Sequence, residues 1–198
     1  MRVVRWTVGI AVCANLTLGG CASVRPQQSA RVQFMHGVRL LNERPAGANI
    51  PAGIRLIRRA ARNNLAIAQD RIGLMYLQGW DVPADTARGM KWIRRAAERG
   101  APAAELQLGN LYRAGRVVPR SWARAYYWYA IAAKPVWGDV HIRNSTQIHA
   151  LARRLRRQVA VALSTHERAR ILRRVARWQP LPSVPYTGWV TLGPPSAR

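Results

Sequence analysis

The residues that could do acid–base or metal chemistry in this chain are few and scattered. Among 198 residues there are only eight Asp and Glu side chains, and the four histidines are His36, His141, His149 and His166. No histidine pair has the spacing of a helical zinc motif, and no glycine-rich phosphate loop or Gly-x-Ser-x-Gly sequence occurs. Asp139 lies two residues before His141, so an acid–base pair formed by these two side chains stays an alternative. The sequence therefore predicts a protein without catalysis, cofactor or metal.

A different kind of chemistry is indicated by the first 21 residues, which have the layout of an export signal. Two arginines precede a mostly apolar run from Trp6 to Leu18, which is too short to span a bilayer as a helix. The run ends in the letters LGGC at Cys21, and this ending resembles the lipobox of bacterial lipoproteins. The resemblance implies a signal over 1–20 and a lipidated Cys21. Because Ala22 follows, it also implies sorting to the outer membrane, facing the periplasm. A buried N-terminal helix with an incidental cysteine is the alternative.

Positive charge is the third chemical feature. Lys and Arg number 32, the formal net charge is +24, and all but two of the cations are arginines. Such an excess favours anionic partners, although we expect no nucleic acid for an exported protein. The candidates for binding anionic lipid or lipopolysaccharide lie opposite the apolar stripes of the last two expected helices: Arg153, Arg154, Arg157, Arg170, Arg173, Arg174 and Arg177. The alternative is that these arginines only form a solvated surface.

A phrase repeated along the chain shows which elements position these side chains. The letters RIGLMYLQGWDVP (71–83) recur as QLGNLYRAGRVVP (107–119), which aligns Gly73 with Gly109 at a period of 36. A partial third copy, IRLIRRAA (54–61), precedes MKWIRRAA (90–97) by the same period. Fixed-period similarity of this length predicts a solenoid of two-helix units.

The aligned pattern resembles the Sel-one-like repeat, a relative of the tetratricopeptide repeat. The resemblance covers 65–134 well and 54–64 partly. It implies a helical platform that binds proteins. The disulfides of many secreted members have no counterpart, because both cysteines of this chain lie in its first 21 residues.

We therefore expect an all-α fold, a short α/α solenoid with a degenerate N-terminal half-repeat and a C-terminal capping helix pair. Gly79 is expected to end a helix, Asp85 and Ser121 to cap the following helices, and Ser164 with Glu167 to form a capping box. The expected segments are a signal (1–20), a lipidated cysteine and tether (21–35), repeats (36–134), a basic helix pair (135–178) and a proline-rich tail (179–198) that stays outside the fold.

Partner-binding side chains are expected on the first helix of each repeat, on the face opposite the packed one. This face carries Ile67, Asp70, Leu74 and Leu77, and 36 residues on it carries Ala103, Leu106, Asn110 and Arg113. The alternative for Leu74 and Leu77 is packing under the N-terminal half-repeat or the tether. The aromatic run at 122–130 is interpreted as core filling rather than a stacking site.

These observations lead to one hypothesis and two rivals. The leading hypothesis is a non-catalytic outer-membrane lipoprotein whose helical platform binds another envelope protein. The second is direct binding of an anionic envelope component by the arginine-rich helices. The third, which is suggested only by the family resemblance, is an enzyme that acts on peptidoglycan.

Overall fold

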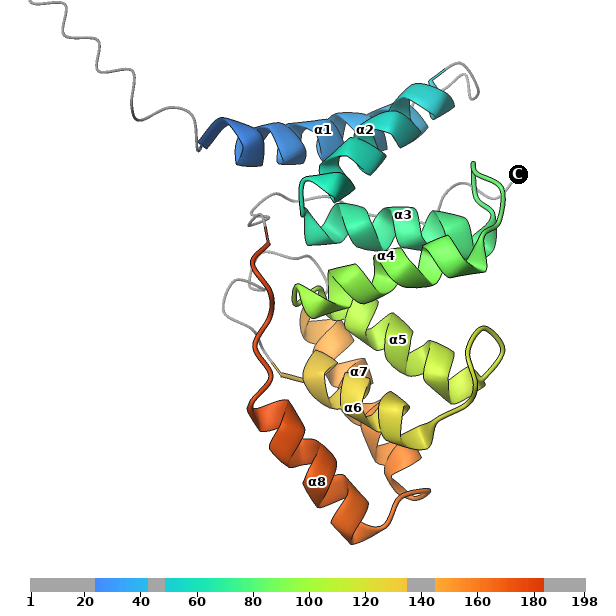
Figure 1. Ribbon diagram of the computed structural model, residues 1–198, viewed down its shortest axis with the longest axis vertical. Coiled ribbons are helices and arrows are strands. Elements are labelled where there is room, and N and C mark those ends of the chain that lie inside the picture. Colours follow the sequence, from blue (N-terminus) through green and yellow to red (C-terminus); the bar gives the residue numbers. More distant parts are fainter. Residues whose placement is uncertain (1–23, 43–48, 135–144, 184–198) are drawn as a thin grey trace, which may run out of the picture.

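The computed structural model describes residues 24–42, 49–134 and 145–183, and all regular structure in these ranges is α-helical, as predicted. Three helix pairs follow one another along the long axis of the molecule, and two further helices cover the end of the stack (Figure 1). The helices are α1 (Val24–Asn42), α2 (Ile50–Arg62), α3 (Ala66–Gln78), α4 (Thr86–Glu98), α5 (Pro102–Ala114), α6 (Trp122–Ala132), α7 (Ser145–Ala160) and α8 (Thr165–Ala176).

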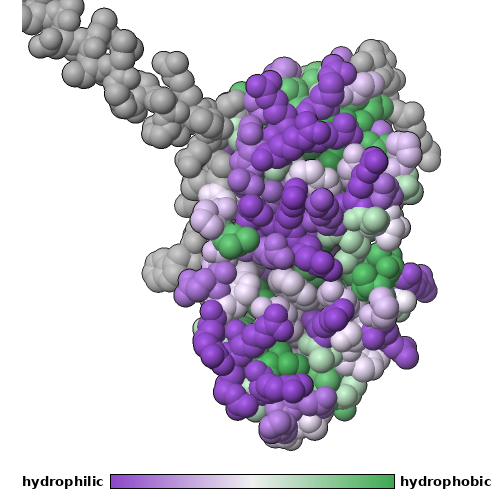
Figure 2. All heavy atoms as spheres, in the orientation of Figure 1, coloured by the Kyte–Doolittle hydropathy of each residue, from purple (hydrophilic) through white to green (hydrophobic). Residues whose placement is uncertain are grey.

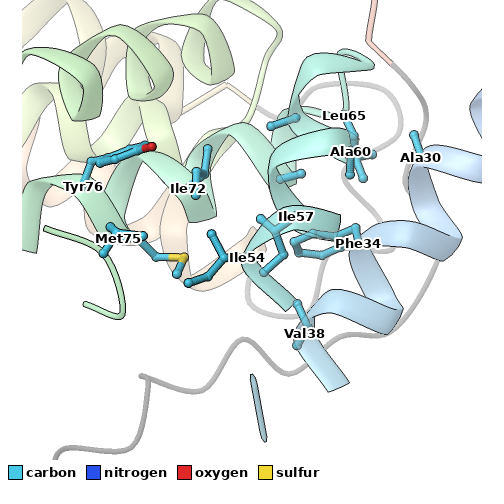
Figure 3. Close-up of a cluster of buried hydrophobic side chains, with 13 residues drawn as sticks. Ala30, Phe34, Val38, Ile54, Ile57, Ala60, Leu65, Ile72, Met75 and Tyr76 are labelled. Carbon is cyan, nitrogen blue, oxygen red and sulfur yellow. The ribbon is translucent and has the colours of Figure 1, made fainter. Parts of the chain in front are cut away.

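Each of the first three pairs is one repeat, and successive repeats pack on one another. Helix α1 contacts α2, α3 contacts α4, and α5 contacts α6, while α2 also contacts α3 and α4 also contacts α5. The core of the first repeat continues into the second, because Ile54 and Ile57 of α2 belong to the same buried cluster as Ile72 and Met75 of α3 (Figure 3). The predicted solenoid is therefore confirmed.

Glycines spaced 36 residues apart let the two helices of each repeat approach closely. A Cβ atom added at Gly73 would lie 2.8 Å from the side chain of Ile93, and one added at Gly109 would lie 2.4 Å from the ring of Tyr129. Gly37 meets Ile57 in the same way in the first repeat. Each helix pair thus needs a residue without a side chain at its crossing point.

The predicted helix ends are confirmed. Gly79 and Gly115 follow α3 and α5 in the left-handed conformation, with φ of 72° and 69°. Asp85 accepts a backbone hydrogen bond at the start of α4. Ser164 and Glu167 form the reciprocal hydrogen bonds of a capping box at the start of α8.

Helix α1 corrects the predicted N-terminal boundary. A tether was expected over 21–35, but the helix begins at Val24, so the expectation is wrong for residues 24–35. Ala30, Phe34 and Val38 recur every four residues, and all three are buried in the core shared with α2 (Figure 3). The predicted N-terminal half-repeat is therefore completed by α1 into a full helix pair.

The two C-terminal helices cap the stack by packing on its last repeat. Helix α6 contacts both α7 and α8, and α7 also contacts α5. Val159 of α7 and Val175 of α8 are buried among the aromatic side chains of α6, such as the fully buried Tyr129 and the half-buried Trp128. The aromatic run of α6 is thus mostly core, as predicted.

The chain after α8 runs back along the stack, and we call Trp178–Ser183 the C-terminal strap (Figure 1). The backbone N–H of Leu181 donates to the carbonyl of Glu98 at 2.8 Å. The hydroxyl of Ser183 donates to the carbonyl of Asn64 at 3.1 Å and accepts from the N–H of Ala66 at 3.4 Å. Residues 179–183 therefore belong to the fold, contrary to the prediction that they lie outside it. The rest of the tail lies outside the described residues.

Candidate functional surfaces

The surface predicted to bind a partner is mostly covered by packing. Ile67 packs on the core of the first repeat, and Leu74 and Leu77 pack on the core of the second. Leu106 packs on the clusters formed by α6 and α7. The reason is that α3 packs against two helices, α2 and α4, and α5 packs against three, α4, α6 and α7. Of the eight predicted positions only Arg113 is exposed, and the others are half-buried or buried.

Asn110 and Arg113, the two polar residues of the predicted partner face on α5, have different surroundings. The side-chain oxygen of Asn110 accepts a hydrogen bond from the hydroxyl of Tyr129 at 2.8 Å, so this amide helps to hold α5 against α6. Arg113 is exposed. Burial raises the pKa of Tyr129, and Arg113 opposes that rise through its charge and a hydrogen bond. Arg113 is therefore the member that remains accessible to a partner.

Asp70 was predicted to face a partner, and this prediction is wrong. Asp70 is only 4% exposed, and its Oδ1 accepts no hydrogen bond from any described residue. Burial raises the pKa of Asp70 to about 7, and the charge of the neighbouring Arg71 opposes that rise. Burial also lowers the pKa of Arg71, against the charges of Asp70 and Asp81. A carboxyl in this position affects stability and cannot contact another molecule.

The seven predicted anion-binding arginines are all exposed. The guanidinium of Arg174 lies over the ring of Tyr127, 4.6 Å from its centroid, and Arg177 donates to the carbonyl of Arg173 at 3.5 Å. Hydrophilic side chains also cover much of the face of the stack shown in Figure 2. The arginines on α7 and α8 are therefore available to an anionic surface.

The remaining predicted residues show no clustering in the part of the chain that the structure describes. His149 is buried, with Nδ1 2.7 Å from the carbonyl oxygen of Ala132, and His166 is exposed. Within 24–42, 49–134 and 145–183, no three His, Cys, Asp or Glu side chains gather as metal ligands would. No helix in those ranges has the length and apolar character needed to cross a membrane. Cys21, Asp139 and His141 lie outside them.

Sequence reasoning missed a groove on the first repeat, which we call the basic groove. It has a volume of about 750 Å³ and is lined by His36, Leu40, Ala52, Arg55, Leu56, Arg58, Arg59 and Arg62, all from α1 and α2. Four of the eight lining residues are arginines, and none is acidic. The sequence held one signal for it: the period of 36 aligns Arg62 with Glu98, so the first repeat lacks a carboxylate that the second repeat has.

Three stacked helix pairs, with a glycine contact repeated at one period, define a helical-repeat solenoid. A sequence model of the Sel1 repeat matches residues 30–65, 66–100 and 102–134, which together make up more than half of the chain. The protein therefore belongs to the Sel1 repeat family. The first match includes most of α1, in agreement with the complete first repeat seen in the structure.

Two solved structures share this architecture. One is a Sel1 repeat protein from Oxalobacter formigenes, with 30% identity and a TM-score of 0.54 over 68% of this chain and 94% of that one. The other is c5321, a protective antigen of uropathogenic Escherichia coli strains with an SLR fold, at 24% identity and a TM-score of 0.51. The match covers 75% of this chain and only 33% of c5321, so it bears on the fold alone. No curated protein sequence matches the chain.

Proposed function

We propose that this protein is a non-catalytic lipoprotein of the bacterial cell envelope whose Sel1 stack binds a protein partner. Sel1 repeats generally mediate protein–protein interaction, and Sel1 repeat proteins are typically non-catalytic scaffolds. The observation that carries the proposal is the stack of three repeats, which builds a continuous surface from separate helix pairs. The LGGC ending at Cys21 supports an anchor in the outer membrane, facing the periplasm.

The proposed arrangement places the stack close to its anchor. Helix α1 begins at Val24, only a few residues after Cys21, and α1 is already part of the first repeat. The proposed partner-facing edge consists of the half-buried Ile67, Leu74, Leu77, Leu106 and Asn110, together with the exposed Arg113. The partner on this view is another envelope protein.

The anchor is tested with Cys21→Ser in the native host. We expect the wild-type protein to carry lipid and to fractionate with the outer membrane, and the variant to lose both properties. Cys13→Ser is the matched control, because Cys13 lies inside the expected signal and should be removed with it. An uncut, unlipidated N-terminus in the wild-type protein would refute the anchored form of the proposal.

Partner binding is tested with a photoreactive amino acid in place of Arg113, whose side chain reaches solvent from α5. We expect crosslinks to one dominant envelope protein, and we expect Arg113→Glu to weaken its recovery with the wild-type chain. Crosslinks to many proteins in proportion to their abundance would contradict a specific partner.

A second candidate function is supported by the exposed arginines of α7 and α8. These helices could hold the protein against anionic lipid or lipopolysaccharide, since guanidinium groups pair with phosphates through two hydrogen bonds. The test is cosedimentation with anionic vesicles after Arg170, Arg173, Arg174 and Arg177 are all changed to Gln. The matched control changes four exposed cations elsewhere, namely Lys91, Arg94, Arg116 and Arg120. Equal loss in both variants, or binding insensitive to salt, would exclude these helices as the site.

A further inference from the structure

The basic groove lies where a preceding repeat would pack. Three of its four non-arginine lining residues correspond, 36 residues on, to positions that pack against the core shared with α2: His36 to Ile72, Leu40 to Tyr76 and Leu56 to Trp92. The fourth, Ala52, corresponds to the exposed Arg88. Ile72 is fully buried, Tyr76 is 7% exposed, and Trp92 packs against the same core, which includes Ile54 and Ile57 of α2. Among the described residues the groove therefore lies at the first end of the stack, at the place where a preceding repeat would contribute a helix.

Apolar side chains near this end are left uncovered by the described residues. Val32 is 64% exposed and Met35 is 46% exposed, although both lie within α1. The residue that corresponds to Val32 in the second repeat is Ala68, which is fully buried against the first repeat. Burial of Val32 and Met35 by a partner would be favourable for the same reason that α3 packs on α2.

The charge of the groove specifies the character of that partner. Arg55, Arg59 and Arg62 are exposed along one side of α2, with no acidic residue in the lining. Arg58 donates to the hydroxyl of Tyr76 at 3.0 Å, but its buried Nε has no hydrogen-bond partner among the described residues. Carboxylates of a docked molecule would pair with these guanidinium groups.

The chain itself is poorly suited to fill the groove. Residues 1–23 and 184–198 contain no Asp or Glu. A second copy packed through the same end would bring the same four arginines, and one packed through its last two helices would bring the exposed arginines of α7 and α8. Like charges facing each other at an interface oppose association in both cases. Outside the described residues the chain has only two carboxylates, Glu43 and Asp139, which are too few to flank an amphipathic helix, so we assign the complementary carboxylates to a different protein.

We propose that the first end of the stack docks an amphipathic helix of a partner protein, with an apolar face flanked by Asp and Glu. The apolar face packs on Val32, Leu40 and Leu56, and the flanking carboxylates pair with Arg55 and Arg59. This helix takes the place on the first repeat that α2 takes on the second. The inference rests on the proposed protein-binding function and adds its site and the chemistry of its partner.

A synthetic peptide provides the first test. It carries the α2 sequence, residues 50–62, with Arg55→Glu, Arg59→Glu and Arg62→Glu, so that the face that packs on α3 is kept and its flanks become acidic. We expect saturable binding to the full chain and about tenfold weaker binding to the Arg55→Glu, Arg59→Glu protein. Arg153→Glu with Arg154→Glu is the control, because it makes the same charge change on α7.

Two results with the peptide would overturn the proposal. A scrambled peptide of the same composition that binds equally well would show that charge alone is recognised. Equal binding to the groove variant and to the α7 control would place the peptide elsewhere. Circular dichroism of both protein variants, matching that of the wild type, ensures that the comparison is made between folded proteins.

The second test places a photoreactive amino acid at Met35, at Arg113 or at Leu172 in the full chain in its native envelope. An adduct at Met35 to an acidic amphipathic helix, lost with Arg55→Glu and Arg59→Glu, supports the proposal. An adduct at Met35 to lipid or to this chain's own residues 1–23 overturns it. Protein adducts only at Arg113 or Leu172 overturn it while leaving the proposed function intact. The absence of protein adducts at all three positions counts against both.

Discussion

Asp70 shows how burial decides the role of a charged side chain in this molecule. The sequence places it beside Gln69 and Arg71, a polar group of three that looks solvated, and all three are buried. Gln69 meets part of its hydrogen-bonding need by donating to the carbonyl of Ala61 at 2.9 Å. Asp70 instead has a raised pKa, because the charged carboxylate is costly to bury.

The pKa of Asp70 gives a direct prediction for stability. The folded value of about 7 lies above the ordinary value of 3.8, so the folded state binds the proton more tightly. The resulting stabilisation is complete below the ordinary pKa and is lost as the pH rises to the folded one. We expect the free energy of unfolding to fall by up to about 3 kcal/mol between pH 5 and pH 8, at about 1.4 kcal/mol per pH unit over the affected range.

Urea unfolding of the wild type and of Asp70→Asn at both pH values measures this effect. The variant should lose most of the difference between the two pH values. Glu98→Gln, a change at a less buried position on α4, is the control and should keep it. An equal pH dependence in the wild type and Asp70→Asn would show that this carboxyl stays charged in the folded protein.

The errors in the predicted partner face also belong to single residues. Apolar spacing identifies one packed stripe on a helix, but α3 packs against both α2 and α4. The alternative for Leu74 and Leu77 was packing under the N-terminal half-repeat or the tether. Both residues do pack, but against the core of the second repeat. Which side of a helix is covered twice depends on how the repeats stack, and the spacing within one helix does not contain that information.

At the scale of helices, the crossing glycines control how closely each pair packs. Gly109→Ala would place a Cβ 2.4 Å from the ring of Tyr129, which is fully buried and cannot easily move away. Alanine favours a helix over glycine by about 1 kcal/mol, but overpacking a core costs about 1–3 kcal/mol. Because the clash is severe, we expect a net loss of about 2 kcal/mol and a lower thermal midpoint.

The matched control for this variant is Gln107→Ala, at a half-buried position on the same helix. It should change the thermal midpoint much less. A Gly109→Ala protein as stable as the wild type would mean that α5 and α6 can separate without loss, contrary to the close packing described here.

Most helices could be predicted because their ends carry side chains with a local effect. Gly79 and Asp85 act through their own backbone or the next turn, so their residue types are informative without the tertiary structure. Helix α1 was missed because the repeated phrase is degenerate there. The period was nevertheless present in Gly37 and Gly53, which lie 36 residues before Gly73 and Gly89. That α1 and α2 cross at Gly37 and Gly53 is shown only by the contact between these two helices.

At the scale of the whole molecule, net charge opposes the folded state. The cations that give the formal charge of +24 lie closer together in the folded chain than in the unfolded chain, so they repel one another more strongly when the chain folds. We expect the free energy of unfolding to increase as NaCl is raised from about 0.01 M to about 0.15 M, where the screening length falls from about 30 Å to about 8 Å. Chemical unfolding by urea at each salt concentration measures the change.

Neutralising three exposed cations of α7 with Arg153→Gln, Arg154→Gln and Arg157→Gln should reduce this gain from salt. Stability that falls as salt is added would mean that favourable ion pairs outweigh the repulsion. The ion pair between Arg88 and Asp85, at 3.1 Å, lies on an exposed helix end and contributes little at this scale.

The C-terminal strap gives a fourth prediction. Ser183→Ala removes both hydrogen bonds to the turn between α2 and α3, and we expect a loss of about 1 kcal/mol. Amide exchange of Ala66 should become faster, because its N–H loses an acceptor. Ser196→Ala is the matched control in the same tail. Unchanged exchange at Ala66 would show that the strap does not hold this turn.

The same strap sets the order in which the fold can be completed as the chain emerges. Neighbouring repeats fold from local contacts, whereas the bonds from Ser183 to Asn64 and Ala66 join residues separated by 119 and 117 positions. The first repeat emerges from the ribosome, and in the proposed exported form from the export channel, long before Ser183 does. The turn after α2 therefore lacks its hydrogen bonds to Ser183 until almost the whole chain has emerged. A chain that ends at Trp178 should be cleaved by a protease at that turn faster than the full chain is.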